Sequence, residues 1–164
     1  MTKAQHIPVS ALQTESECII RSLGPNEKTA QRLAQMGILP GTHLRIIRIA
    51  PLGDTIEVTG DQGQSFALRQ QEVAAMSCEP VAMPLVSEMV TIGQTYKIRT
   101  LLGGKNFRQR MGNEGLMEGG HIQLQKNSSM LIRVNLIDRG IQIELGQGEA
   151  KKIIVEVLSH ESGK

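Results

Sequence analysis

Two histidines, His43 and His121, are the residues whose type and spacing most readily point to chemistry. They stand 78 positions apart, in stretches that resemble each other. Imidazole is a common ligand of iron and zinc, so the pair could hold a divalent transition metal. No carboxylate or cysteine stands at ligand spacing beside either histidine. We therefore favour surface histidines copied by duplication and predict no firm cofactor. Weak binding of Fe²⁺ or another divalent transition metal is the alternative.

Patterns for catalysis are incomplete. The stretch 103–106, Gly-Gly-Lys-Asn, matches part of a phosphate-binding loop but lacks the upstream glycine and the Ser or Thr after the lysine. None of the four histidines sits in a recognisable catalytic string. Cys18 and Cys78 have no metal-ligand spacing, and we expect core positions for them rather than a soft metal site or a redox pair. The sequence predicts a protein that is not an enzyme.

The two histidines belong to an internal repeat. Residues 31–54 read QRLAQMGILPGTHLRIIRIAPLGD, and residues 109–126 read QRMGNEGLMEGGHIQLQK. An offset of 78 positions aligns five identical residues in the two stretches: Gln31, Arg32, Gly37, Gly41 and His43 with Gln109, Arg110, Gly115, Gly119 and His121. This agreement predicts a duplication and two units of like topology.

Each unit needs a helix, a tight turn and several short strands to position these residues. Asn26 is a candidate N-cap, and Gly37 ends the helix. Residues 39–42, Leu-Pro-Gly-Thr, have the pattern of a type II turn. Alternating apolar residues then predict strands near 43–49, 55–59 and 64–68. About five short strands with one short helix after the first predict a mainly β fold, two tandem SH3-like small β-barrels.

The domain boundaries follow from the repeat. We expect a first barrel over residues 10–80, a second over 88–158, and an apolar connector over 81–87. The connector is too apolar for a free linker. We expect it to bury apolar side chains between or against the barrels: Val81, Met83, Leu85 and Met89. Residues 1–10 are expected to form a loose arm.

The composition argues against nucleic acid as a partner. Aromatic residues are only 2% of the chain, so stacking platforms for bases are scarce, and the net charge is +2. Basic residues do cluster near the second helix: Lys97, Arg99, Lys105, Arg108 and Arg110. A solvated face is the favoured interpretation of this cluster, and a docking patch for an acidic partner is the alternative. No run reaches the roughly 20 apolar residues of a membrane span, and the start lacks a signal-peptide pattern, so we expect a cytoplasmic protein.

The string RLAQMGILPGTHLRIIRIAPLGDTIEV, residues 32–58, closely resembles the ferrous-iron transport protein A (FeoA) family. The matching positions are Gly37, Pro40, Gly41, Ala50, Pro51, Leu52, Gly53 and Asp54. The later FALRQQEVAAM is similar to the family's segment before its final strand. The second half is similar to a degenerate member, without the Pro-Gly turn or the Ala-Pro-Leu-Gly-Asp loop.

The resemblance implies an SH3-like fold, a cytoplasmic location and a non-enzymatic role in ferrous-iron uptake. Members of the family are thought to bind the cytoplasmic side of the membrane ferrous-iron permease that carries a GTPase domain. A typical member is a single unit, so the tandem form departs from the family pattern. Homo-oligomerisation is left open by the sequence. A regulatory SH3-like module of a metal-dependent transcriptional repressor and a nucleic-acid-binding barrel are the alternative functions.

Two family-like loops in the first unit are the candidate partner-binding residues: the turn Leu39, Pro40 and Gly41, and the loop Pro51, Leu52, Gly53 and Asp54. A rigid loop that only supports the barrel explains these residues as well as a docking surface does. A stiff loop that presents leucine to solvent loses little entropy when a partner binds. Because the second copy has lost one proline and the whole second loop, we expect the first unit to carry the partner contact.

Overall fold

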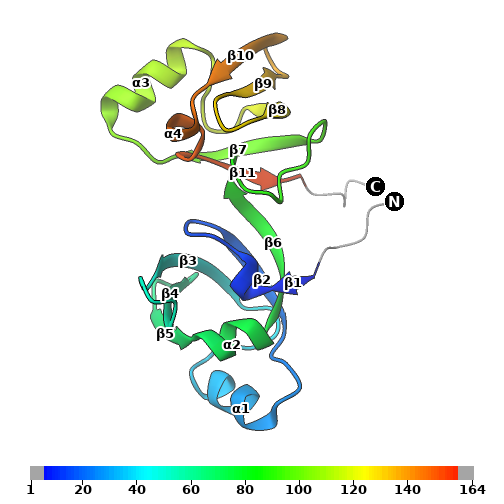
Figure 1. Cartoon of the computed structure of the whole chain (residues 1–164), viewed down its shortest axis with the longest axis vertical. Helices are drawn as coiled ribbons and strands as arrows, with labels where there is room; N and C mark the ends of the chain where they lie inside the picture. Colours follow the sequence, from blue (N-terminus) through cyan, green and yellow to red (C-terminus); the bar gives the residue numbers. More distant parts are fainter. Residues whose placement is uncertain (1–5, 159–164) are drawn as a thin grey trace. The chain divides into compact units, whose positions relative to one another are not determined.

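The computed structural model describes residues 6–158, and the chain divides after residue 81 into two compact units. Each unit is mainly β, with one short helix after its first long strand (Figure 1). Both units have the SH3-like barrel fold, so the predicted fold class is confirmed.

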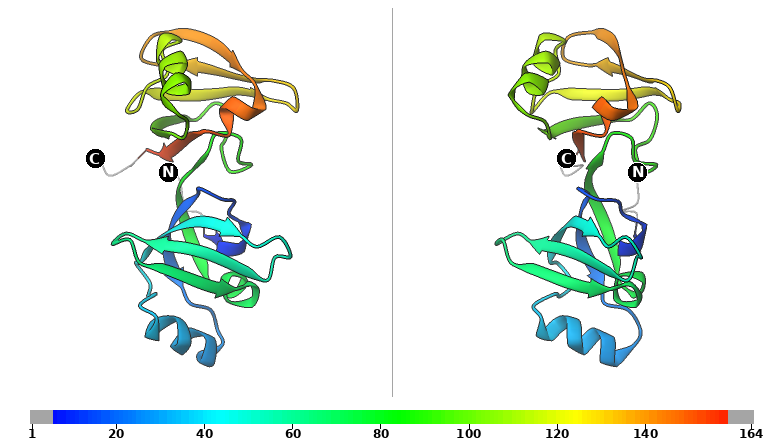
Figure 2. Two further views of the ribbon diagram at one scale, coloured as in Figure 1. Left: turned by 90° about the vertical axis from the view of Figure 1, so that its left-hand side faces the viewer. Right: turned by 60° about the vertical axis from the view of Figure 1, so that its left-hand side comes forward.

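The first unit forms a sheet in the order β6-β2-β3-β4-β5, and β1 pairs with β6. Its elements are β1 (Ile7–Pro8), a short 3₁₀ helix (Val9–Ala11), β2 (Glu17–Ser22), α1 (Glu27–Gln35), β3 (His43–Ile49), β4 (Thr55–Gly60), β5 (Ser65–Arg69), α2 (Gln70–Ala75) and β6 (Ser77–Pro84). Helix α1 stands at one end of these strands (Figure 2).

The second unit repeats this plan in the sheet order β10-β9-β8-β7-β11, and the last residues of β6 pair with β11. Its elements are β7 (Thr95–Leu101), α3 (Lys105–Asn113), β8 (His121–Asn127), β9 (Ile132–Leu136), β10 (Ile141–Leu145), α4 (Gln147–Ala150) and β11 (Ile153–Val157). An aliphatic core with a single Tyr and a single Phe fills it.

The predicted ends of α1 are confirmed. The Asn26 side chain accepts a hydrogen bond from the Thr29 N–H at 3.0 Å, which satisfies a free donor of the first turn. Gly37 has φ +96°, where a Cβ is unfavourable, and the Ile38 N–H donates to the Leu33 carbonyl at 2.9 Å. Leu33 and Ile38 are both fully buried. The helix therefore stops where the turn 39–42 has to begin.

One bulge recurs in both units. The pairing of β3 with β4 shifts between Ile46 and Arg48, and the pairing of β8 with β9 shifts between Leu124 and Lys126. These positions are again 78 apart. A bulge adds one residue and bends the strand, which helps a short sheet to close on itself.

The predicted loose arm is wrong for residues 7–9, while residues 1–5 lie outside the described part of the chain. Ile7 and Pro8 pair with Cys78 and Ser77, and the Val9 N–H donates to the Met76 carbonyl at 3.1 Å. Val9 is 1% exposed. Burial of this side chain offsets the entropy lost when the segment is ordered, which explains why it is not loose.

The predicted connector gives the second unit a strand equivalent to the one that residues 7–8 form in the first unit. Met83 and Pro84 pair with Val155 and Ile154, and the Leu85 N–H donates to the Ile153 carbonyl at 2.8 Å. Met83 and Leu85 lie in the core of the second unit, whereas Val81 and Met89 are half-buried. The segment Met-Pro-Leu at 83–85 thus repeats Ile-Pro-Val at 7–9. Packing of the connector between the two barrels stays a prediction.

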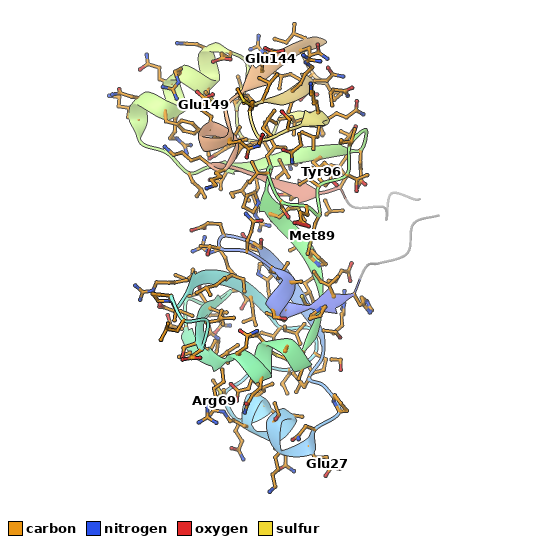
Figure 3. All side chains as sticks on the ribbon, viewed as in Figure 1. Glu27, Arg69, Met89, Tyr96, Glu144 and Glu149 are labelled. Atoms are coloured by element: carbon orange, nitrogen blue, oxygen red, sulfur yellow. The ribbon has the colours of Figure 1, made fainter. Side chains whose placement is uncertain are left out.

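An arginine–glutamate pair joins the two helices of each unit. Arg32 of α1 binds the Glu72 carboxylate of α2, which also accepts the Arg69 N–H at 2.9 Å. The equivalent pair in the second unit joins Arg110 and Glu149 at 3.0 Å. Figure 3 shows Arg69 at the start of α2 and Glu149 on α4.

The two pairs differ in burial. Glu72 is only 2% exposed, whereas Glu149 is half-buried. Burial alone raises the pKa of Glu72, but the Arg69 N–H and the Arg32 guanidinium outweigh it and hold this pKa below 4.5. The charged carboxylate is therefore stabilised in the folded protein.

Replacement of Glu72 by Ala should lower the free energy of unfolding of the first unit by about 2 kcal/mol, because it removes a buried ion pair whose arginine is partly solvated. The matched change Glu149→Ala should cost the second unit about 0.5 kcal/mol, since that pair is more exposed. Hydrogen exchange of core amides in β4 and β9 measures the two units separately.

The effect of Glu72→Ala should also depend on pH. The folded-state pKa of Glu72 is depressed, so its contribution to stability is complete above pH 4.5 and is lost as the pH falls through the folded-state value. The difference in unfolding free energy between wild type and variant should shrink over that window. Equal losses in the two units, or a difference that does not change with pH, would contradict this account.

Candidate functional site

The turn that follows α1 is held by three hydrogen bonds. The Thr42 N–H donates to the Leu39 carbonyl, and the Leu39 N–H donates to the Thr42 hydroxyl, both at 2.9 Å. The Gly41 N–H donates to the Ile20 carbonyl of β2 at 2.6 Å, and Gly41 has φ +97°. Leu39 is nevertheless 50% exposed. The turn is stiff and presents an apolar side chain to solvent.

The loop between β3 and β4 has the same character. The Ala50 N–H donates to the Thr55 carbonyl at 2.9 Å, and the Gly53 N–H closes a turn on Ala50 at 2.8 Å. The Asp54 carbonyl accepts the N–H of Gln70 at the start of α2, at 3.2 Å. Leu52, at the tip, is 86% exposed. A side chain this exposed adds nothing to the core and is accessible to a partner.

The structure does not bring the two loops together. The turn 39–42 precedes β3 and the loop 50–54 follows it, so a strand of seven residues lies between them. At a rise of about 3.3 Å per residue, they stand about 20 Å apart along the strand. One small contact cannot cover both loops, and a partner that binds both must extend along β3.

A hollow lies beside the loop 50–54, with a volume of ≈ 640 Å³. It is lined by residues of β3, β4, β5 and the loop: Arg48, Ala50, Pro51, Thr55, Glu57, Ser65, Phe66 and Ala67. Arg48 binds Glu57 at 3.1 Å on its rim. Ala67 and its neighbour Phe66 lie at the hollow because Ala67 pairs with Glu57, which also lines it. Sequence reasoning missed these two residues, since only the strand register reveals their position.

Each candidate metal histidine lies against one carboxylate that the sequence does not place beside it. His43 Nε2 is 3.1 Å from a Glu17 oxygen, and His121 Nδ1 is 3.1 Å from an Asp138 oxygen. Glu17 reaches His43 because Ile19 of β2 pairs with His43 of β3. Only the register between β2 and β3 predicts this contact, and that register cannot be read from the spacing of residues along the sequence.

Asp138 also accepts the backbone N–H of His121 at 2.8 Å. This N–H, and then the imidazole, hold the pKa of Asp138 below 3.8. The carboxylate therefore fixes the start of β8 as well as the ring. These two residues line a second hollow of ≈ 520 Å³ in the second unit, together with Glu118 and Arg139.

The residues present do not fit a resident transition metal. A structural zinc site uses four protein ligands and a catalytic one uses three, whereas each histidine has a single carboxylate partner. Within residues 6–158, no group of three or more His, Cys, Asp or Glu side chains comes together. Cys18 and Cys78 are both buried, and a hydrogen bond to Cys78 together with burial raises the pKa of Cys18, which disfavours the thiolate that metals bind.

The basic cluster near α3 is largely used inside the unit. Arg108 binds Glu118 at 3.0 Å and donates to the Leu101 carbonyl at 2.7 Å. Arg110 binds Glu149, and Arg99 lies 3.9 Å from Glu156. These contacts support the solvated-face interpretation, since all three arginines of the cluster lie against carboxylates of their own unit.

Gly103, the first of the two glycines before α3, has a packing role. A Cβ at Gly103 would lie 2.2 Å from the ring of Phe107, which Arg110 and Lys152 cover from about 5–6 Å. This contact explains the glycine without a phosphate ligand. Separately, no helix in the described residues is both long and apolar enough to cross a membrane.

Comparisons with known proteins relate both units to one family. The family model of the FeoA domain matches the chain twice, over residues 7–80 and 83–157. The matches begin at the first residues of the repeated segments 7–9 and 83–85. The resemblance found in the sequence is confirmed.

The chain is also similar to solved structures. The solution structure of iron(II) transport protein A from Clostridium thermocellum is 31% identical, covers 96% of this chain and 92% of its own, and superposes with a TM-score of 0.51. The FeoA-like protein of Clostridium acetobutylicum is 30% identical over 49% of this chain and 90% of its own, with a TM-score of 0.43. FeoA of Stenotrophomonas maltophilia, solved in complex with zinc, is 24% identical over 43% of this chain and 87% of its own, with a TM-score of 0.38.

We predict that the full chain binds Fe²⁺ weakly or not at all, because one histidine and one carboxylate make a poor site. Anaerobic titration calorimetry should show no stoichiometric binding at micromolar protein, and His43→Ala and His121→Ala should leave the heat unchanged. Tight binding that either substitution abolishes would make that histidine a ligand.

Proposed function

The chain belongs to the FeoA domain family, which is associated with ferrous-iron transport, and from this premise we propose a specific role for it. It acts as a non-enzymatic cytoplasmic accessory protein of ferrous-iron uptake. It binds the cytoplasmic side of the membrane permease that carries a GTPase domain. The contact is made by the first unit, through the loop Pro51–Asp54 and the turn Leu39–Gly41.

The exposure of Leu52 on a fixed loop carries this proposal. Its side chain is 86% exposed, while the backbone around it is tied to Thr55 and to the start of α2. A leucine that is solvated in the free protein and fully buried in a complex contributes about 1.5–3 kcal/mol to binding. Because the loop is already ordered, little of that gain is lost to entropy.

The second unit does not keep the family-like residues of this loop, although its own β8–β9 loop exposes Met130. Its β8–β9 loop, residues 128–131, reads Ser-Ser-Met-Leu and does not carry the Ala-Pro-Leu-Gly-Asp motif. In its turn, Glu118 stands where Pro40 stands in the first unit, and its carboxylate accepts hydrogen bonds from Arg108 and Thr100. The Arg108 guanidinium lowers the pKa of Glu118, so this charge serves its own unit. These differences support the first unit as the partner-binding one.

The separation of the two loops sets their relative importance. Since they stand about 20 Å apart along β3, we assign the primary contact to the loop Pro51–Asp54, where Leu52 is the more exposed leucine. The turn Leu39–Gly41 is a secondary contact, reached only by a partner that follows β3. Ferrous iron is the cargo of the permease in this proposal, and the chain does not need to hold it.

Replacement of Leu52 by Asp should weaken binding to the permease's cytoplasmic domain about tenfold or more, because it places a charge where an apolar side chain is buried. Titration calorimetry measures the affinity. Met130→Asp is the matched control, since Met130 is 84% exposed on the β8–β9 loop of the second unit. It should change the affinity by less than about twofold.

Both variants should fold, because a solvated loop tip tolerates a charge, and circular dichroism checks this. If Leu52→Asp binds as wild type does, or if it unfolds, the loop is scaffold and the proposal fails. Equal losses of affinity in the two variants would show that the contact is not specific to the first unit.

A further inference from the structure

Strand β5 forms an edge of the sheet of the first unit. It pairs with β4 on one side, and among the described residues no strand pairs with its other side. The Gly60 N–H donates to the Gln64 carbonyl, so hydrogen bonding toward β4 alternates from there through Phe66 and Leu68. The backbone groups of Ser65 and Ala67 therefore point away from β4. They are available to a further strand.

This edge carries little that would block such a strand. Natural sheets protect edges with lysine, proline, bulges or covering loops. The outward residues Ser65 and Ala67 are small and exposed. The charged outward residue, Arg69, lies at the far end of the strand. The Arg69 N–H is already bound to Glu72, so the open part of the edge is centred on Ala67.

The hollow beside the loop 50–54 adjoins this edge. Ser65, Phe66 and Ala67 form one wall of it, and Ala50 and Pro51 form part of another. Because Ala67 is small, a side chain from an added strand can pass over it into the hollow. Half of the lining residues are apolar, namely Ala50, Pro51, Phe66 and Ala67, so the hollow can accept a large aliphatic or aromatic side chain.

We propose that β5 is a docking site for an extended segment of a protein partner, which adds to the sheet as an antiparallel strand. The residue opposite Ala67 places a large apolar side chain in the hollow. The residue opposite Arg69 is two positions away, on the same face. The exposed guanidinium there selects a carboxylate. The segment therefore reads acidic-x-apolar from its amino end.

The shape of the hollow distinguishes this partner from a second copy of the chain. If two β5 strands paired about Ala67, Ala67 would face Ala67 and Ser65 would face Arg69. No large apolar side chain would then enter the hollow from the added strand. A segment of different sequence fills it. This inference rests on the proposed function only in that the permease is the expected source of the segment.

Nuclear magnetic resonance of the full chain tests the proposal directly. The probe is an acetylated and amidated hexapeptide, Thr-Glu-Thr-Leu-Thr-Ser. We expect the Ser65 and Ala67 amides to shift and to exchange more slowly with solvent as peptide is added. Peptides with Leu replaced by Ser, or Glu replaced by Lys, should bind about tenfold more weakly or worse.

Two substitutions test the contributions of the backbone edge and of the hollow to peptide binding separately. Ala67→Pro removes one outward N–H at an edge position where proline is tolerated, and Ala67→Phe occupies the hollow. Each should weaken peptide binding about tenfold or more. The control Gln142→Pro alters β10, the terminal strand in the second unit, and should leave the affinity unchanged.

Failure of these substitutions to weaken binding, or equal loss in Gln142→Pro, overturns the proposal. So does protection of Ser65 and Ala67 that grows with protein concentration in the absence of peptide, since a second copy then covers the edge. If Leu52→Asp abolishes permease binding and Ala67→Pro does not, this inference fails while the proposed function stands. If the permease domain never binds but the peptide does, the proposed function fails and the docking site stands.

Discussion

The first unit depends on one buried carboxylate, that of Glu72. A charge removed from water costs several kcal/mol unless it is paired and hydrogen-bonded, and Glu72 meets this condition through Arg32 and the Arg69 N–H. The pair joins α1 to α2, so it fixes the helix that ends at Gly37. The turn that presents Leu39 begins directly after that helix. The position of the turn is thus supported by a partly buried ion pair outside the turn itself.

The sequence was sufficient for the parts of the fold that local chemistry controls. The ends of α1 follow from Asn26 and Gly37, and the alternating apolar residues place β3 and β4 almost to the residue. The repeat itself followed from shared glycines and histidines. Short-range rules suffice for such features because the deciding contacts lie within a few residues.

The candidate site was less predictable, because its contacts join distant parts of the chain. The wall that Phe66 and Ala67 form depends on strand register, and so does the carboxylate beside His43. The segment at residues 7–9 was missed for another reason. It resembles residues 83–85 over only three residues, which is too short a match to identify from the sequence. The strand pairing shows that both segments hold equivalent positions in their units.

The repeated segments also define how the two copies join. The period from Ile7 to Met83 ends inside β6, the strand that closes the first unit and whose last residues open the second. In evolutionary terms, the duplication boundary falls within a strand and leaves no spacer whose length selection could adjust. A third copy inserted at this boundary would receive its opening strand from the copy before it. The gene can therefore gain or lose whole barrels without having to acquire a linker.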